Sequence, residues 1–275
     1  MNKLLLPVLL LFAVPVVAQQ PYWQQELSYT MKATLNDNEK SILGEESIVY
    51  KNNSPHALDF IWFHIWPNAY KNENTALIKQ IKGDSSRSRK MENFGTGYID
   101  GLAFTADGQP VKTEPHPNPQ YIDIIKVVLN KPLEPGAAVT IATPFKVKLP
   151  PYFSRSGYAA TEIMACQWYP KPAVYDKDGW HEMPYLDMGE FYSEYATYSV
   201  SLTVPAEYVV SATGTLQTKD ELAAYKRLGS ANAKNRTAKP ELYKPAGTGP
   251  KTLQYYAEQV PDFAWFADKD FVIEY

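Results

Sequence analysis

Residues 27–50 read LSYTMKATLNDNEKSILGEESIVY, and this stretch indicates how the chain folds. Apolar and polar residues alternate over 27–35 and again over 41–50, on either side of the turn-forming Asn36-Asp37-Asn38. Alternation with a period of two directs one row of side chains toward a core and the other toward solvent. The stretch therefore predicts two β-strands, each with one buried face.

Strand patterns recur at short spacing along the rest of the chain. Residues 59–66 are almost wholly apolar and aromatic, as expected of a strand buried on both faces. Turn residues such as Ala106-Asp107-Gly108 separate the strands. The other predicted strands are 98–105, 121–129, 138–149, 163–168, 195–204, 208–216, 253–260 and 271–275. We expect an all-β domain whose antiparallel strands form several saddle-like or sandwich-like sheets.

One short helix is predicted near 219–228. Thr218 and Glu221 have the spacing of a capping box, and Gly229 is placed to end the helix in a left-handed conformation. Residues 229–252 are rich in Lys, Asn, Gly and Pro and lack periodicity, so we expect an exposed excursion from the domain. The basic stretch within 82–93 is expected to be a solvated loop.

The first eighteen residues have the features of a secretory signal peptide. Lys3 precedes an apolar run over 4–17, and Val16 and Ala18 are the small residues of a cleavage site before Gln19. The run is shorter than the roughly 20 apolar residues of a membrane helix, with an uncleaved anchor as the alternative. We expect one domain over 19–275, exported to the periplasm or beyond the cell, with no membrane span after cleavage.

The composition of the chain limits the functions that it can have. The net charge is −3 and there is no basic stripe, so nucleic acid is a poor candidate partner. The chain has one cysteine, Cys166, which cannot form an intrachain disulfide. The 20 Tyr, 11 Phe and 6 Trp suit many short strands, and they also keep stacking on carbohydrate open as a function.

The motifs that bear chemistry in this chain are incomplete. Residues 181–185, HEMPY, begin like the zinc motif His-Glu-x-x-His, but Tyr185 replaces the second histidine. Pro184 would also break the helix that the motif requires. Cys166 has apolar and aromatic neighbours and is expected to be structural rather than nucleophilic.

The remaining histidines and acids suggest no site by their spacing. The four histidines are too far apart in sequence for a metal site, and His64, within an aromatic strand, is expected to belong to the core: His56, His64, His116 and His181. A carboxylate cluster could hydrolyse glycosides if two members faced each other across a cleft. We expect instead that its members bind neighbouring groups: Glu182, Asp187, Glu190 and Glu194.

Residues 150–186 are the richest stretch in aromatic, proline and glycine residues, and read PPYFSRSGYAATEIMACQWYPKPAVYDKDGWHEMPYL. Such a composition is typical of a rigid surface of loops and strands. Loops of fixed geometry often shape a cleft, so a cleft is expected here, with a purely packed corner as the alternative.

Six short sequences support a resemblance to a known family: FHIWPNAY (63–70), QWYPKPAVYD (167–176), GWH (179–181), EFY (190–192), ATG (212–214) and PDFAWF (261–266). They resemble the zinc aminopeptidases of the aminopeptidase N and leukotriene-hydrolase type, in the exported form found in Bacteroidetes-like bacteria. The match spans nearly the whole chain after the signal peptide.

The resemblance implies an amino-terminal β domain that caps a thermolysin-like catalytic domain. In the family, a glutamine of this domain helps hold the free amino end of the substrate, and it corresponds to Gln167. An amide oxygen suits that role because it accepts a hydrogen bond from an ammonium without burying a full charge. Trp168, Tyr169 and Asp176 belong to the same short sequence and complete the expected substrate-binding set.

The resemblance also places the zinc site outside these 275 residues. The family's Gly-x-Met-Glu-Asn loop, His-Glu-x-x-His helix and later Glu ligand would follow residue 275. We therefore expect no metal ligand and no catalytic residue in this chain, Zn²⁺ in a C-terminal catalytic domain that is its partner, and a peptide substrate. The alternative is a stand-alone exported β-sandwich module that binds a glycan or a protein.

Overall fold

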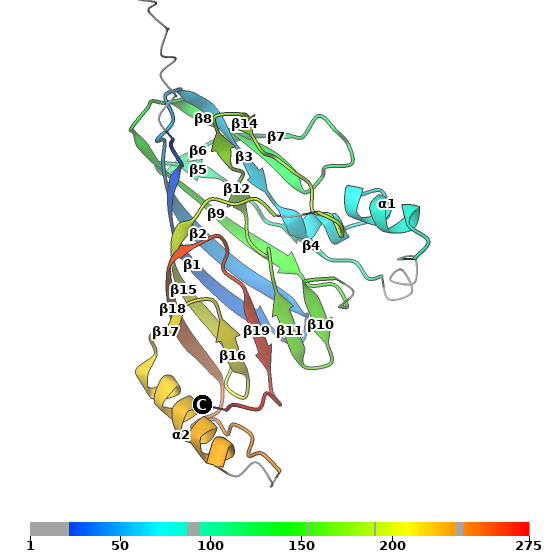
Figure 1. The fold of residues 1–275 in the computed structure, drawn as a ribbon, viewed down its shortest axis with the longest axis vertical. Coiled ribbons are helices and arrows are strands. Elements are labelled where there is room, and N and C mark those ends of the chain that lie inside the picture. The colour runs from blue at the N-terminus through cyan, green and yellow to red at the C-terminus, as the bar shows by residue number, and fades with distance from the viewer. Residues whose placement is uncertain (1–21, 87–93, 153, 190, 235–238, 275) are drawn as a thin grey trace, which may run out of the picture.

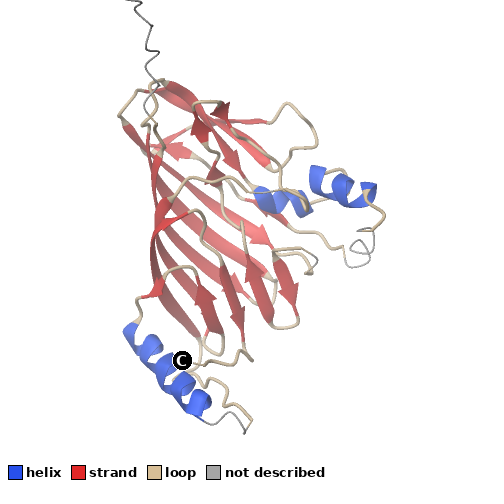
Figure 2. Cartoon of the chain, in the orientation of Figure 1, coloured by secondary structure: helices blue, strands red, loops and turns tan. Residues whose placement is uncertain are grey.

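The structure is a computed structural model that describes residues 22–86, 94–152, 154–189, 191–234 and 239–274. The predicted signal peptide lies outside these ranges. Within them the chain forms a nine-stranded sheet, two four-stranded sheets and a two-stranded sheet. Figure 1 shows the long strands of the main sheet with the smaller sheets beside one of its faces, and Figure 2 shows how strongly strands predominate. The expectation of an all-β domain with several sheets is confirmed.

The main sheet has the order β17-β18-β15-β1-β2-β9-β5-β6, and β4 also pairs with β9. Its strands are antiparallel except for the parallel pair β1 and β15. Burial alternates strictly along β1, which confirms the two-residue period of 27–35. The strands are β1 (Glu26–Asn36), β2 (Ser41–Lys51), β4 (Tyr98–Asp100), β5 (Thr105–Ala106), β6 (Gln109–Pro110), β9 (Ala138–Lys148), β15 (Ala196–Pro205), β17 (Thr215–Leu216) and β18 (Pro250–Val260).

The smaller sheets are built from short strands. One has the order β10-β11-β19-β16, with β10 (Gly157–Ala159), β11 (Glu162–Ala165), β19 (Trp265–Asp268) and β16 (Val209–Ala212). The second has the order β12-β3-β8-β7, with β12 (Lys171–Pro172), β3 (Leu58–His64), β8 (Ile124–Leu133) and β7 (Lys112–Pro115). A hairpin of β13 (Tyr175–Asp176) and β14 (Gly179–Trp180) completes the set.

One large core joins the main sheet to the smaller sheets. Tyr29 and Tyr198 from the main sheet stack with ring centroids 4.6 Å apart, and both are almost fully buried. Phe63, Trp168 and Trp265 belong to the same core. Burying a large apolar side chain contributes roughly 1.5–3 kcal/mol, so these rings hold the layers together.

The described residues also form three helices outside the sheets. They are η1 (Trp66–Tyr70), α1 (Ala76–Gly83) and α2 (Lys219–Lys234). The predicted strand 59–66 ends at His64 because Pro67, in the first turn of η1, favours the helical backbone. Helix α1 was not predicted, although its buried Leu77, Ile78 and Ile81 stabilise it against η1.

The prediction for α2 was too short. The helix continues to Lys234, and Gly229 is a buried helical residue rather than a left-handed cap. The Thr218 hydroxyl accepts a hydrogen bond from the Gln254 N–H at 2.8 Å, while Glu221 binds Lys251 and Tyr243. The predicted capping box is therefore replaced by contacts with the strand that follows the excursion, and part of that excursion is helical.

Glycines interrupt two of the predicted strands. Gly101, at φ +71°, separates β4 from β5 within 98–105. Gly214, at φ +87°, separates β16 from β17 within 208–216, and an added Cβ would lie 2.3 Å from the Tyr256 carbonyl oxygen. Only glycine adopts such a close, left-handed backbone readily. The last predicted strand was wrong over its described part, because 271–274 has no regular structure and β19 lies earlier.

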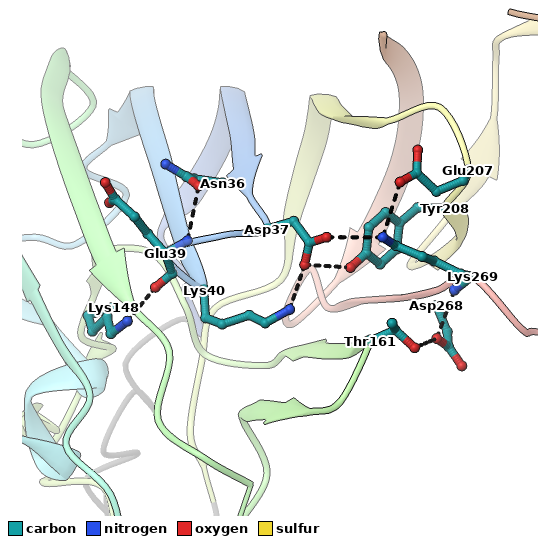
Figure 3. A network of polar contacts seen from close by, with 10 residues as sticks. All are labelled: Asn36, Asp37, Glu39, Lys40, Lys148, Thr161, Glu207, Tyr208, Asp268 and Lys269. Atoms are coloured by element: carbon teal, nitrogen blue, oxygen red, sulfur yellow. Dashed lines mark hydrogen bonds and ion pairs between the residues drawn. The ribbon is translucent and has the colours of Figure 1, made fainter. Parts of the chain in front are cut away.

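Ion pairs and hydrogen bonds at the surface link the turn between β1 and β2 to residues next to β16 and β19 (Figure 3). We call these contacts the Asp37 network. Asp37 Oδ1 lies 2.5 Å from Lys40 Nζ and accepts a hydrogen bond from the Tyr208 hydroxyl at 2.7 Å. Lys269 Nζ lies 3.2 Å from Asp37 Oδ2 and 3.1 Å from Glu207. Burial alone would raise the pKa of Asp37, but hydrogen bonds from Lys40, Tyr208 and Lys269 outweigh it and lower that pKa.

Candidate functional site

The segment that leaves β11 carries the predicted glutamine. Gln167 has φ +47°, a left-handed conformation that is uncommon for a residue with a side chain. The next residue, Trp168, is fully buried, and its Nε1–H donates to the Phe263 carbonyl oxygen at 3.0 Å. The indole packs against Phe145 and Trp265. The anchored Trp168 thus fixes the backbone in which Gln167 is strained.

The side chains of the segment converge on Asp262, which follows β18. Gln167 Nε2 donates to Asp262 Oδ2 at 2.9 Å, and the Tyr169 hydroxyl donates to Oδ1 at 2.7 Å. Lys171 Nζ donates to the same Oδ1 at 3.1 Å and to the Pro261 carbonyl oxygen at 2.6 Å. We call Gln167, Tyr169, Lys171 and Asp262 the Asp262 network.

The network lies at the edge of the core, with its lysine buried and its aspartate partly exposed. Lys171 is only 2% exposed. Burial lowers the pKa of Lys171, and the charge and hydrogen bond of Asp262 oppose that shift. Burial likewise raises the pKa of Tyr169, with a further contribution from the Asp262 charge. A buried ion pair of this kind persists because each partner satisfies the other.

Gln167 leaves one acceptor in the network unused. A carboxylate only accepts hydrogen bonds, so the amide NH2 must face Asp262 and the amide oxygen must point elsewhere. That oxygen, Oε1, is enclosed and has no hydrogen-bond partner among the described residues. It can accept a hydrogen bond from an ammonium or amide group once the surrounding side chains move apart.

Asp176 lies in a different cluster from the Asp262 network. Its Oδ1 is 2.7 Å from His181 Nε2 and accepts the Asp178 N–H at 2.8 Å, and its Oδ2 accepts the Tyr192 hydroxyl at 3.2 Å. Burial would raise the pKa of Asp176, but these hydrogen bonds lower it. Of the predicted site residues, the structure brings Gln167 and Tyr169 together, buries Trp168 beneath them and places Asp176 in a separate polar group.

Lys171 and Asp262 were not predicted as site residues. Both belong to short sequences that carry the family resemblance, but nothing nearby in sequence links them, since they are 91 residues apart. One signal was available. A lysine between two prolines in an aromatic stretch is expected either to be exposed or to have a buried acidic partner.

The other residues that the sequence analysis considered for chemistry have surroundings that indicate a structural role. His64 is fully buried, which lowers its pKa to about 3, and its Nε2 accepts the Met183 N–H at 3.2 Å. Burial raises the pKa of Cys166 to about 11, which disfavours the reactive thiolate. Glu182 lies 4.0 Å from His116, whereas Glu194 accepts the Gln25 N–H at 3.4 Å. Glu190 lies outside the described residues.

The described residues lack both a cluster of metal ligands and an apolar helix of membrane-spanning length. They contain no group of three or more His, Cys, Asp or Glu side chains arranged to hold a metal ion. In the same ranges, no helix has the length and apolarity that crossing a bilayer requires. The exposed aromatic side chains are spread over several elements: Tyr22, Tyr152, Tyr192, Tyr195, Tyr256 and Phe266.

Comparisons with known proteins found similar solved structures but no matching sequence. No family model matches the sequence, and no curated protein does. Solved structures similar to the chain include an M1 zinc metallopeptidase from Deinococcus radiodurans, with 15% identity and a TM-score of 0.48 over 89% of this chain and 42% of that chain. A mutant of that metallopeptidase bound to a Tyr-ser-ala substrate has the same identity and coverage and a TM-score of 0.47.

A two-domain M1 zinc metallopeptidase mutant bound to L-tryptophan is also similar, with 15% identity and a TM-score of 0.47 over 89% of this chain and 43% of that chain. The chain thus spans less than half of the length of these proteins. At this identity the likeness concerns the fold.

Proposed function

We propose that the chain is the noncatalytic amino-terminal domain of an exported zinc metallo-aminopeptidase-like protein. In this role it covers the cleft of a C-terminal catalytic domain and helps bind the free amino end of a peptide. The zinc ion and the hydrolytic residues belong to that partner domain. Cleavage after Ala18 would release the mature chain on the far side of the membrane.

The observation that carries the proposal is the state of Gln167. Its backbone is held in a left-handed conformation, its amide nitrogen is bound to Asp262, and its amide oxygen has no partner among the described residues. Backbone strain and an orphaned acceptor at one residue are features of functional positions. An ammonium donates up to three hydrogen bonds, so it complements this oxygen.

The site needs movement before it can act, because Oε1 is enclosed. Rotation of the side chain away from Asp262 would bring the amide to the surface while Tyr169 and Lys171 keep the carboxylate satisfied. The proposed contact is therefore made by a second rotamer of Gln167, formed when the peptide or the catalytic domain binds.

The gene offers a direct test. An in-frame continuation beyond codon 275 that encodes His-Glu-x-x-His supports the proposal, and a stop codon there contradicts the capping role. The 275-residue chain alone should neither bind zinc stoichiometrically in a titration nor show peptidase activity that a chelator removes. Tight zinc binding by this chain would place the metal in the wrong domain and overturn the proposal.

A second test addresses Gln167 itself in the protein as its gene encodes it. Gln167→Ala should raise KM for an aminoacyl anilide about tenfold, since a hydrogen bond to a charged group is lost. Gln254→Ala, which truncates an exposed glutamine on β18, is the matched control and should leave KM unchanged. Equal kinetic constants for both variants would show that Gln167 does not contact the substrate.

A further inference from the structure

Two hollows open on the outer face of the main sheet. The smaller sheets lie beside the other face, and alternate residues of β1 are exposed on this one (Figure 1). The first hollow has a volume of about 510 Å³, and its lining includes Thr30, Lys32 and Ser47. The second has a volume of about 420 Å³, and its lining includes Ser28 and Val49. Both volumes fall within the range of roughly 300–1,000 Å³ that is typical of ligand sites.

The two hollows lie side by side along β1 and β2. Thr30 is paired with Ser47, and Ser28 is paired with Val49. Residues two apart on one face of a strand are ~7 Å apart, so the two pairs are neighbouring rows of the same face. The lining follows residues 26–32 of β1, which span ~20 Å. We call the two hollows together the outer trough.

The polar groups that line the outer trough both donate and accept hydrogen bonds. Hydroxyl groups come from Ser28, Thr30 and Ser47, and an amide group comes from Gln259. Gln259 has φ +56° beside the irregular pairing of β15 with β18, and such bulges redirect side chains. A ligand that carries many hydroxyl groups matches this lining, because hydroxyl and amide groups have both hydrogen-bonding functions.

The exposed charges in the outer trough occur as pairs. Lys32 Nζ lies 3.0 Å from Glu45 in the first hollow, and Lys51 Nζ lies 3.0 Å from Glu26 in the second. Each cation is therefore matched by an anion in the lining. A neutral ligand suits such a surface, whereas an anionic polymer would compete with carboxylates that already hold both lysines.

An exposed aromatic ring borders the second hollow. Tyr195 belongs to the lining and is 56% exposed. Its ring offers an apolar face against which the C–H groups of a sugar ring can pack. Tyr256 is 40% exposed on the same face of the sheet but belongs to the lining of neither hollow. The two tyrosines therefore form a matched pair for substitution.

The position of the outer trough favours a sugar over a peptide. Strand β1 lies between β15 and β2, and β2 lies between β1 and β9, so their backbone groups already bind neighbouring strands. An extended peptide commonly adds to an open sheet edge, where it binds unpaired backbone groups. On the face of a sheet, recognition depends on side chains, and those of the trough are mostly hydroxyl, amide and aromatic groups.

We propose that the outer trough is a binding site for a neutral oligosaccharide. Hydroxyl groups of the ligand exchange hydrogen bonds with Ser28, Thr30 and Gln259, and one sugar ring packs on Tyr195. The site goes beyond the proposed function because it lies on the face of the sheet opposite the Asp262 network. Between Ser28 and Thr30, the Tyr29 side chain points into the core, where its ring centroid is 5.7 Å from that of Tyr169.

Binding of neutral hexasaccharides to the 275-residue chain tests the site. The probes are maltohexaose, cellohexaose, xylohexaose, mannohexaose and N-acetylchitohexaose. An anionic hexamer of galacturonic acid and the peptide acetyl-Ser-Gly-Ser-Gly-Ser-amide are the controls. NMR follows the backbone amide signals of the chain. At least one neutral probe should shift the signals of Ser28, Thr30 and Ser47 in a saturable way and leave that of Gln167 unchanged, whereas neither control should shift them.

Variants assign the binding to the outer trough. Tyr195→Ala and Gln259→Gly should each weaken it about tenfold, and glycine keeps the left-handed backbone at 259. Tyr256→Ala, the matched control, should bind as the parent chain does. Thermal unfolding of each variant checks that it folds. Gln167→Ala should also bind the oligosaccharide normally, so failure of this site and failure of the proposed function are distinguishable.

Three outcomes would overturn the proposal. The first is the absence of any shift on β1 and β2 with every neutral hexasaccharide in large excess. The second is an equal or larger response to the anionic hexamer or to the peptide, which would mean that the trough takes another class of ligand. The third is unchanged affinity in folded Tyr195→Ala and Gln259→Gly.

Discussion

The Asp37 network and the Asp262 network use the same chemistry in opposite surroundings. Each has an aspartate held by a lysine and by a tyrosine hydroxyl. The Asp37 side chain and its partner Lys40 are each 20% exposed, whereas the Lys171 side chain is only 3% exposed (Figure 3 shows the first of the two networks). The Asp262 side chain is itself 20% exposed, so the two networks differ in the burial of the lysine rather than of the aspartate.

The two networks also differ in whether all of their hydrogen-bonding atoms have partners. Around Asp37 each carboxylate oxygen has a cationic partner, and two lysines share the charge. Around Asp262 one oxygen binds Lys171 and Tyr169 and the other holds Gln167, whose own oxygen has no partner in the described chain. The Asp37 network, in which both carboxylate oxygens have partners, stabilises the turn between β1 and β2. An unused acceptor in a partly buried network is consistent with the ligand-binding role proposed for Gln167.

Lys171→Met should produce the largest effect on stability. Removing the buried cation leaves the partly exposed Asp262 carboxylate without its charge partner, which should cost about 2–3 kcal/mol. Urea unfolding should report this loss, while Lys40→Met should cost at most about 1 kcal/mol because Lys269 also holds Asp37 and the pair is partly exposed. Adding Asp262→Asn to Lys171→Met should recover part of the loss. Similar losses for the two lysine variants would contradict the comparison.

Glu46 extends the comparison to a carboxyl group without a partner. It lies on the core face of β2, and neither of its oxygens has a hydrogen bond within the described residues. Burial raises the pKa of Glu46 well above its usual value, so the folded protein keeps the carboxyl protonated. Its stabilising contribution is therefore complete below the unfolded pKa of about 4.3 and is lost as pH rises toward the folded pKa.

Glu46→Gln should remove that pH dependence, because a neutral amide replaces the titrating group. Between the two pKa values of Glu46, stability of the parent chain should fall by up to about 1.4 kcal/mol per pH unit relative to the variant. Unfolding by urea at several pH values from 5 to 9 measures the difference. Parallel pH profiles for the two proteins would show that Glu46 has an unidentified partner in solution.

Gln167 and Lys40 allow the strain in the two networks to be compared. Both have left-handed backbones, at φ +47° and φ +51°. Gln167→Ala should cost about 1.5 kcal/mol through loss of the hydrogen bond to Asp262. Gln167→Gly should be about 1 kcal/mol more stable than Gln167→Ala, since glycine tolerates this backbone. Lys40→Gly and Lys40→Ala should differ by a similar amount. No difference within either pair would mean that the backbone relaxes.

The sequence predicted the long strands well because half-buried strands carry a two-residue period. The alternation of 27–35 and 41–50 corresponds directly to β1 and β2. Prediction failed where a distant contact decides the local structure. Gly229 looks like a helix end, but Asn232 binds Glu241 and Ile273, and α2 continues past the glycine.

The candidate site likewise includes residues that the sequence indicated and residues that it did not. Gln167 was predicted through a resemblance in neighbouring residues. Its strained backbone, and an amide oxygen without a partner among the described residues, are not visible in the sequence. Its partners Lys171 and Asp262 come from segments 91 residues apart, so only the packing of β18 against the segment after β11 brings them together. Asp176 was placed with Gln167 because both belong to one short sequence, but the backbone between them carries Asp176 to another cluster.

The smallest expected effect is the salt dependence of the contacts that Lys269 makes in the Asp37 network. Lys269→Met removes contacts with Asp37 and Glu207 at the surface and should cost at most about 1 kcal/mol at low ionic strength. In 1 M NaCl the Debye length falls to about 3 Å, so this cost should nearly vanish. The cost of Lys171→Met should fall much less, because the Lys171 side chain is only 3% exposed. Urea unfolding of both variants with and without salt therefore distinguishes a screened network from a buried one. If the stability loss caused by Lys171→Met fell as much with salt as that of Lys269→Met, the Asp262 network would be open to solvent.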